Sequence, residues 1–214
     1  MDKIDCFLGE NCYNDQKERD GMYKLCKTEQ SANRQRRLEQ GLLQAMLVKH
    51  FDEISVSDLC LQLEVPRKAF YRYFDSKEGA LHALLDHTLM AYESFPLIYS
   101  EGEKRTLVRE LEQFFLFWIR QKPLLDALQR SGLSGELIVR AIRQASSEVS
   151  VPKRFLSADT HAMQRHVTMF GVCGLMSMVL QWHRDGYPES ARFMAEVAVR
   201  LLTRPLFPNA EALL

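Results

Sequence analysis

Apolar side chains recur every three or four positions along most of the chain, which is the spacing of one face of an α-helix. In residues 33–51 these positions are Leu38, Leu42, Leu43, Met46 and Leu47. Similar runs predict further helices at about 55–63, 66–74, 76–92, 103–121, 123–131, 135–148, 158–184 and 189–204. Strand-type alternation is absent from the sequence, so we expect an all-α fold of about nine helices, with a loop at 149–157.

Several residues mark where these helices begin and end. Ser55 is followed three positions later by Asp58, and Ser76 is followed by Lys77 and Glu78. A serine hydroxyl can accept a hydrogen bond from a free amide in the first turn of a helix, and an acidic residue there favours the positive helix end. Pro66 suits the start of the third helix, because its missing N–H needs no partner there.

The third predicted helix has an apolar face and a basic face. At 100° per residue, Phe70 and Phe74 share one face, whereas Lys68, Ala69 and Arg72 point the other way. Two short helices joined by a tight turn, the second with outward cations, are typical of a helix-turn-helix that enters the major groove of DNA. The pattern therefore predicts DNA binding.

The sequence from about residue 33 to residue 90 resembles the TetR family of transcriptional regulators. The matching stretches are "SVSDLCLQLEVPRKAFYRYF" and "DSKEGALHALL", which are similar to the helix-turn-helix of that family and to the start of its next helix. Residues 1–32 are polar and show no periodicity, so we expect a flexible extension there. The resemblance implies a DNA-binding domain at 33–80 and an effector-binding and dimerisation domain at 81–214. Glu64 stands where the family usually has glycine, so the backbone either avoids a positive φ there or tolerates strain.

The resemblance also implies roles for single residues. Arg67, Lys68 and Ala69 would approach base edges, and Ser55 and Ser57 would lie where the second helix meets the DNA backbone. Phosphates would be held by Tyr71, Tyr73 and Lys77. The expected DNA-contacting residues are Arg34, Arg36, Arg37, Ser55, Ser57, Arg67, Lys68, Ala69, Tyr71, Arg72, Tyr73 and Lys77.

The resemblance assigns effector binding and dimerisation to the C-terminal part. For an apolar or aromatic effector, the aromatic or polarisable candidates on helices that should face each other are Tyr92, Phe114, Trp118, His166, Phe170 and Cys173. A stripe of aromatic side chains at helical spacing is also typical of an ordinary core. Small residues on an otherwise bulky helix allow another helix to approach, either within the protomer or from a partner. The expected dimer contacts are Gly171, Gly174, Leu175, Met178 and Trp182.

Composition limits the possible classes of protein. Lys and Arg total 28, as do Asp and Glu, so DNA binding must come from a local basic patch rather than from overall charge. The five cysteines contain no C-x-x-C pair and indicate free thiols in a reducing cytoplasm. The longest uncharged run, Val167–Trp182, is 16 residues long, which is shorter than the roughly 20 needed to span a bilayer.

The sequence leads us to expect a DNA-binding regulator that is ligand-responsive, more often a repressor in this family, and binds a palindromic operator as a homodimer. No catalytic motif, metal-ligand pattern or cofactor motif is visible, so we expect no enzymatic activity and no cofactor. Two alternatives remain open at this point. One is a helical enzyme with its active site in the C-terminal bundle, and the other is a protein-binding adaptor or small-molecule-binding protein that does not bind DNA.

Overall fold

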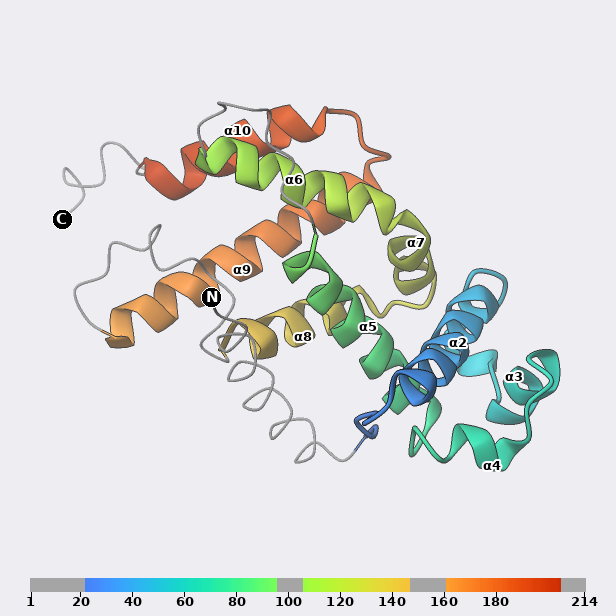
Figure 1. Cartoon of the computed structure of the whole chain (residues 1–214). Helices are drawn as coiled ribbons and strands as arrows, with labels where there is room; N and C mark the ends of the chain where they lie inside the picture. Colours follow the sequence, from blue (N-terminus) through green and yellow to red (C-terminus); the bar gives the residue numbers. More distant parts are fainter. Residues whose placement is uncertain (1–21, 96–105, 147–160, 205–214) are drawn as a thin grey trace.

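The computed structural model describes residues 22–95, 106–146 and 161–204, and within these ranges the regular structure is helical. The expected all-α fold is confirmed, with the elements arranged as in Figure 1. The helices are α2 (Glu29–Met46), the 3₁₀-helix η1 (Phe51–Glu53), α3 (Val56–Gln62), α4 (Arg67–Phe70), α5 (Lys77–Glu93), α6 (Leu107–Arg120), α7 (Lys122–Arg130), α8 (Ser134–Ser146), α9 (His161–Arg184) and α10 (Ala191–Thr203). The expected loop at 149–157 lies outside the described residues.

The N-terminal half is built from α2, α3 and α4, which pack around the start of α5. Its centre contains the fully buried side chains of Leu42, Met46, Phe70 and Phe74. Burying a side chain of this size contributes about 1.5–3 kcal/mol, so these residues fix how the short helices lie on α2.

The C-terminal half consists of α6–α10. In this half α6 lies along α10, and α8 lies along α9 (Figure 1). Helix α5 joins the two halves, because it packs against α2 on one side and α8 on the other. The expected domain boundary at residue 80 therefore falls inside a helix. Among the described residues, no helix is long and apolar enough to cross a membrane.

The N-terminal segment differs from the sequence-based expectation. Residues 1–32 were predicted to be a flexible extension, but α2 already begins at Glu29 and is capped by the Thr28 hydroxyl, which accepts a hydrogen bond from the Ser31 amide. Tyr23 is buried and forms an isolated antiparallel bridge with Phe74. The prediction is therefore wrong for residues 22–32, whereas residues 1–21 lie outside the described residues.

Candidate nucleic-acid interface

Helix α3 and the turn after it have the geometry of a helix-turn-helix. The Ser55 hydroxyl accepts from the Asp58 amide at 3.0 Å, which confirms the predicted cap. At the other end, the Glu64 amide donates to the Leu61 carbonyl at 3.2 Å, and the Val65 amide donates to the Cys60 carbonyl at 2.9 Å. This pair of bonds is a Schellman motif, in which the residue after the helix takes a left-handed conformation.

Glu64 has the positive φ that this motif requires. Its φ is 55°. The sequence left open whether the backbone avoids a positive φ at Glu64 or tolerates the strain, and the structure shows the strained conformation. A non-glycine residue in the left-handed region costs about 1–2 kcal/mol, because its Cβ crowds the following carbonyl oxygen. Arg37 on α2 also stabilises the turn, since its Nη2 donates to the Leu63 carbonyl at 3.2 Å.

Helix α4 is held to the core by two aromatic anchors. Phe70 and Phe74 are both fully buried, with ring centres 5.1 Å apart. The helix is a single turn rather than the predicted 66–74, because the chain turns again at Tyr71 and brings Phe74 alongside Tyr23. We use the term recognition segment for residues 67–75, which comprise α4 and the turn that follows it.

Five side chains on the recognition segment face solvent, and one of them, Asp75 at its end, is acidic. Arg67, Lys68 and Arg72 are exposed, and Tyr71 is 42% exposed, whereas Ala69 is half-buried. The Arg67 guanidinium lies 5.9 Å from the centre of the Tyr71 ring, and its hydrogen bond with the Tyr71 side chain raises the pKa of Arg67. Arg67 is thus a permanent cation whose position is partly fixed by its neighbour one helical turn later.

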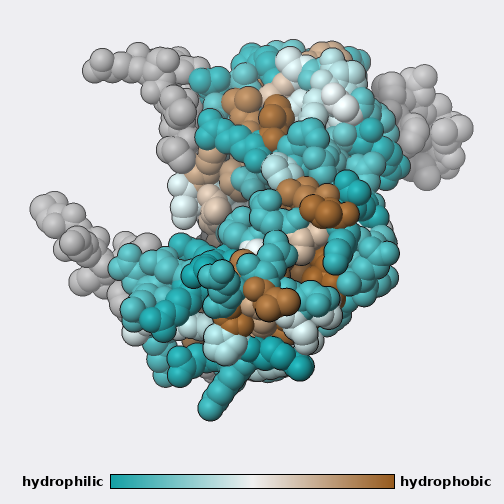
Figure 2. All heavy atoms as spheres, turned by 90° about the vertical axis from the view of Figure 1, so that its right-hand side faces the viewer, coloured by the Kyte–Doolittle hydropathy of each residue, from teal (hydrophilic) through white to brown (hydrophobic). Residues whose placement is uncertain are grey.

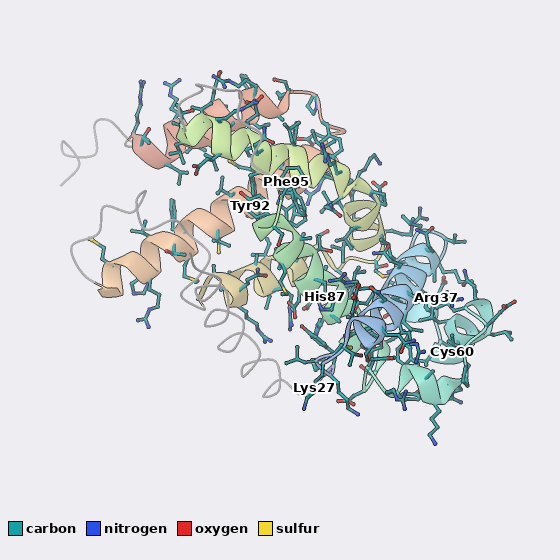
Figure 3. The ribbon with its side chains drawn as sticks, viewed as in Figure 1. Lys27, Arg37, Cys60, His87, Tyr92 and Phe95 are labelled. Carbon is teal, nitrogen blue, oxygen red and sulfur yellow. The ribbon has the colours of Figure 1, made fainter. Side chains whose placement is uncertain are left out.

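The expected contacts on α2 and α3 lie mostly at the surface. Arg34, Arg36 and Ser57 are exposed, and so are Arg37 and Ser55, although these last two also take part in the turn and cap described above. Figure 3 shows Arg37 on α2 and Lys27 before the first turn of that helix. The face shown in Figure 2 is mostly hydrophilic around α2, α3 and α4, and its apolar side chains form small separate groups.

The structure does not support phosphate contacts by Tyr73 and Lys77. Tyr73 is only 5% exposed, and its hydroxyl accepts from Ser31 at 3.5 Å, so it belongs to the core. The Lys77 ammonium donates to the carbonyls of Phe51, Asp52 and Ile54 at 2.8, 3.3 and 3.1 Å. An ammonium has three N–H donors, so all of them are in use.

Two exposed cations were missed because they lie in the segment expected to be flexible. Lys24 and Lys27 are both exposed, and the Lys24 amide donates to the Tyr73 carbonyl at 2.8 Å, at the end of the recognition segment. The segment around Tyr23 is short and shows no periodicity from which a strand could be identified.

The aromatic candidates for an effector pocket divide into two groups. Tyr92, Phe114 and Trp118 come together, with ring centres 5.4 Å apart for Tyr92 and Phe114 and 6.3 Å apart for Phe114 and Trp118. Figure 3 shows Tyr92 and Phe95 at the end of α5, beside α6. The Trp118 Nε1 is buried and has no hydrogen-bond partner in the part of the chain that the structure describes.

The other three candidates lie on α9 and are more exposed than Phe114 and Trp118. His166 is exposed, Phe170 is 66% exposed, and Cys173 is half-buried. A single effector pocket lined by all six residues stays a prediction. Within the described ranges, no group of three or more histidine, cysteine, aspartate or glutamate side chains could hold a metal ion.

The expected dimer contacts also differ in their surroundings. A Cβ built on Gly171 or Gly174 would meet no atom within 4 Å, so both positions are open to another chain. Leu175 and Met178 pack partly against the protomer's own core. Trp182 is buried between Phe115 and Tyr187, and its Nε1 donates to the Glu189 carbonyl, so the structure does not support its expected role in a dimer.

Comparison with solved structures supports the fold. A structure described as the dihydroxyacetone kinase operon activator DhaS covers 79% of this chain and 93% of its own length, with a TM-score of 0.54 and 13% sequence identity. A structure described as a tetR-family transcriptional regulator from Streptomyces coelicolor covers 80% of this chain and 79% of its own, with a TM-score of 0.49 and 20% identity. The likeness to DhaS is one of fold. The sequence matches no protein-family model and no curated protein.

Proposed function

We propose that this chain is a sequence-specific DNA-binding transcriptional regulator. The observation that carries the proposal is the recognition segment, on which Phe70 and Phe74 are buried while Arg67, Lys68 and Arg72 are exposed. Arginine and lysine can donate to the O6 and N7 atoms of guanine in the major groove, and a tyrosine hydroxyl can donate to a phosphate. Arg67 and Lys68 are thus our base-reading candidates, and Tyr71 and Arg72 our backbone contacts.

The surface of the N-terminal half favours DNA over a protein partner. Its apolar side chains are scattered, as with Leu61 on α3 and Val48 after α2, whereas cations lie on α2 and on the recognition segment. A protein-binding site usually has a contiguous apolar centre. The name of DhaS describes an operon activator, which gives this fold a precedent in transcription.

A homodimer would place two recognition segments on one palindromic operator. The stripe on α9 formed by Met163, Val167 and Phe170 is exposed, and Gly174 continues it at helical spacing. Helix α10 adds exposed Phe193, Leu201 and Leu202. A second copy that covers these side chains would form a helical interface, and two-fold symmetry would then match two DNA half-sites about 34–36 Å apart.

The same proposal includes an effector that controls DNA binding. The cluster of Tyr92, Phe114 and Trp118 suits an apolar or aromatic molecule. The Trp118 N–H, which has no hydrogen-bond partner among the described residues, suits a molecule with a hydrogen-bond acceptor. Repression, which the TetR resemblance implies, would follow if the effector binds the DNA-free form better, because ligands shift equilibria only by differential affinity.

Selection from a random duplex library tests the proposal. The purified protein is offered the library at about 0.1 M salt, and the Arg67→Ala variant is run in parallel with Val48→Ala, an exposed apolar position outside the recognition segment. We expect the wild type and Val48→Ala to enrich the same palindrome and Arg67→Ala to lose preference within each half-site. If a folded wild type enriches no sequence with or without candidate effectors, the proposal is wrong.

A further inference from the structure

Residues Met22–Lys24, which we call the N-terminal strap, lie beside the end of the recognition segment. The Lys24 amide donates to the Tyr73 carbonyl at 2.8 Å, and the Asp75 amide donates to the Met22 carbonyl at 3.2 Å. These bonds flank the antiparallel bridge between Tyr23 and Phe74. The strap therefore holds the connection between α4 and α5 in the way that one strand holds its neighbour.

The recognition segment needs such support because α4 is very short. It has four residues, and its N-cap, Pro66, makes no side-chain capping bond. A single helical turn is not stable by itself, since nucleating a helix fixes several backbone angles for few hydrogen bonds. The anchors Phe70 and Phe74 position the buried side of the segment, and the strap bonds position its end.

The strap also fits closely against the first turn of α5. A Cβ on Gly79 would lie 2.0 Å from the Met22 carbonyl oxygen, a separation at which the backbone of the strap would have to move. Glycine in a helix costs roughly 0.5–1 kcal/mol relative to alanine. The close contact with the strap therefore explains why glycine occupies this position.

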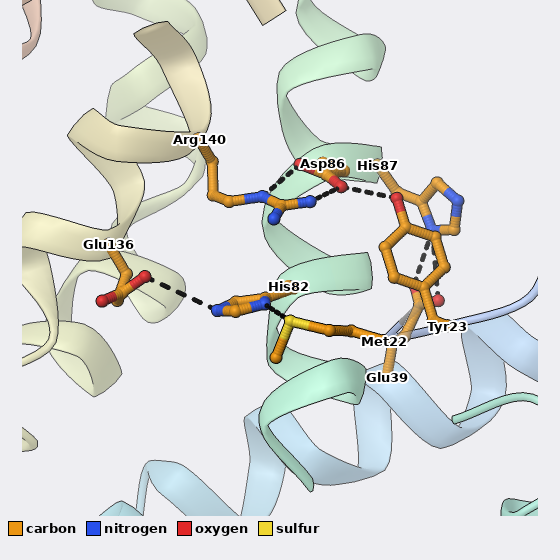
Figure 4. A network of polar contacts seen from close by, with 8 residues as sticks. All are labelled: Met22, Tyr23, Glu39, His82, Asp86, His87, Glu136 and Arg140. Atoms are coloured by element: carbon orange, nitrogen blue, oxygen red, sulfur yellow. Dashed lines mark hydrogen bonds and ion pairs between the residues drawn. The ribbon is translucent and has the colours of Figure 1, made fainter. Parts of the chain in front are cut away.

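Tyr23 connects the strap to the C-terminal half of the protein (Figure 4). Its hydroxyl donates to Oδ2 of Asp86 on α5 at 2.5 Å, and the other carboxylate oxygen accepts from Nε of Arg140 on α8 at 2.8 Å. A second nitrogen of Arg140 also donates to Oδ2. Asp86 and Arg140 are both buried, so the Tyr23 side chain is hydrogen-bonded to a charge pair that is shielded from water.

A second contact links the same three elements. The Nδ1 of His82 on α5 lies 3.1 Å from the Met22 sulfur, and its Nε2 lies 3.5 Å from Oε2 of Glu136 on α8. Figure 4 shows these side chains in line between the strap and α8. Two consecutive strap residues, Met22 and Tyr23, therefore contact α5 side chains that are themselves paired with α8.

We propose that Tyr23 is a positioning residue for the recognition segment, which it ties to α8 through the Asp86–Arg140 pair. Loss of the Tyr23 hydroxyl would loosen the strap, and the segment would then become less ordered although no DNA-contacting side chain has changed. The effect on DNA affinity rests on the function proposed above. The link between strap and segment is a property of the free protein and can be measured without DNA.

Amide hydrogen exchange of the free full-length protein tests this link. Tyr23→Phe removes one hydroxyl and keeps the ring, and Tyr187→Phe is the matched control, because the Tyr187 hydroxyl is also hydrogen-bonded, to His183 at 2.9 Å, but lies near α9. We expect Tyr23→Phe to speed exchange at least about tenfold at the strap-bonded amides of Lys24 and Asp75, the size of effect that one hydrogen bond to a charged group implies. The amides of Tyr71, Tyr73 and Phe74 should speed up with them.

Three outcomes would overturn the inference. Exchange could stay at the wild-type rate, it could rise at Lys24 and Asp75 without any change at residues 71–74, or it could rise equally in all helices as in a general loss of stability. Beyond these three, a rise at the strap and at residues 71–74 in Tyr187→Phe as well would also overturn the inference. Arg140→Met provides a second variant that breaks the pair from the α8 side, and it should affect the same amides if it folds.

Binding to the selected duplex separates this inference from the proposed function. We expect Tyr23→Phe to weaken binding several-fold with an unchanged salt dependence, because no phosphate contact is removed. An unchanged affinity together with faster exchange would show that the strap does not position the segment for DNA. If the wild type binds no duplex, the proposed function fails, while the exchange rates still decide whether Tyr23 holds the recognition segment.

Discussion

The Lys77 ammonium donates to the Phe51 carbonyl at 2.8 Å and lies 4.6 Å from the centre of the Phe51 ring. Lys77 is the first residue of α5, and it binds the connection between α2 and α3. The carbonyls of Asp52 and Ile54 in that connection also accept hydrogen bonds from its ammonium. Phe51 in turn donates its amide to the Ser131 hydroxyl at 3.1 Å, in the connection between α7 and α8. The start of the helix-turn-helix is therefore held from two sides.

Replacement of Lys77 should reduce stability rather than remove a DNA contact. We expect Lys77→Ala to lower the free energy of unfolding by about 2 kcal/mol, since it leaves three carbonyls without their charged donor. Urea denaturation measures this loss. The salt dependence of DNA binding should stay as in the wild type, whereas Lys68→Ala should change DNA binding and leave stability within about 0.5 kcal/mol. If Lys77→Ala instead lowers the slope of log DNA affinity against log salt concentration by about one unit, Lys77 is a phosphate contact and this prediction is wrong.

The backbone conformation of Glu64 predicts a stabilising substitution. Because its φ is 55°, Glu64→Gly should raise the free energy of unfolding by about 0.5–1 kcal/mol, the strain relieved being larger than the entropy that glycine loses on folding. Glu64→Gln removes the charge and keeps the Cβ, so it should leave stability unchanged. Equal stabilisation by both variants in thermal unfolding would assign the effect to charge and not to the backbone.

Arg67 should determine part of the sequence preference. Arg67→Ala is expected to cost about 1–3 kcal/mol on the preferred duplex and much less on duplexes changed at the base pair that Arg67 reads. Competition binding with single-base variants of the selected site measures this difference. Arg34→Ala, at an exposed position on α2, is the comparison, and it should weaken all duplexes by the same factor. A uniform loss in Arg67→Ala as well would make Arg67 a backbone contact.

The exposed stripe on α9 predicts a variant that stays folded but does not dimerise. Phe170 is 66% exposed in the protomer, so Phe170→Glu should preserve helix content and thermal stability measured at low protein concentration. In sedimentation experiments we expect a monomer in place of a dimer. Val48→Glu adds the same charge at another exposed apolar position, just after α2, and should remain dimeric. A dimer in both variants would place the interface elsewhere.

His82 should make the protein less stable in mild acid. Burial, together with the nearby Arg140 guanidinium, lowers the pKa of His82 below its ordinary value of about 6.5. Below pH 6.5 the unfolded chain therefore binds a proton that the folded protein resists, and stability falls until the folded-state pKa is reached. His82→Gln should flatten this part of the pH profile, whereas His166→Gln, at an exposed position, should not. An unchanged profile in His82→Gln would contradict the prediction.

The features that could be predicted correctly from the sequence are those that depend on residues close together in the chain. The helical spacing of apolar residues, the caps at Ser55 and Ser76, and the burial of Phe70 and Phe74 depend on neighbours a few positions apart, and all of these are confirmed. The expected surface positions of Arg67, Lys68 and Arg72 follow from the same periodicity.

The misplaced residues depend on partners distant in the chain. Tyr73 and Lys77 carry groups suited to phosphate, but Ser31 on α2 and the Phe51 carbonyl in η1 give them partners inside the protein instead. Tyr23 finds Asp86 across 63 positions, and a short polar segment shows no periodicity from which that pairing could be read. A charged residue such as Asp86 among the leucines of α5 was the available sign that a buried partner exists.

Helix α5 gives the two halves of the protein a common core. Its first turns, with Ala80, Leu81 and Leu84, complete the interior of the helix-turn-helix, and its last turns reach the aromatic side chains of α6 through Tyr92. A fragment that stopped at residue 80 would lack Leu81 and Leu84, which belong to the same buried core as Phe70 and Phe74. If residues 22–80 were transferred to another protein of this fold, α5 would therefore have to go with them, and the recipient would need an α8 that offers a matching arginine.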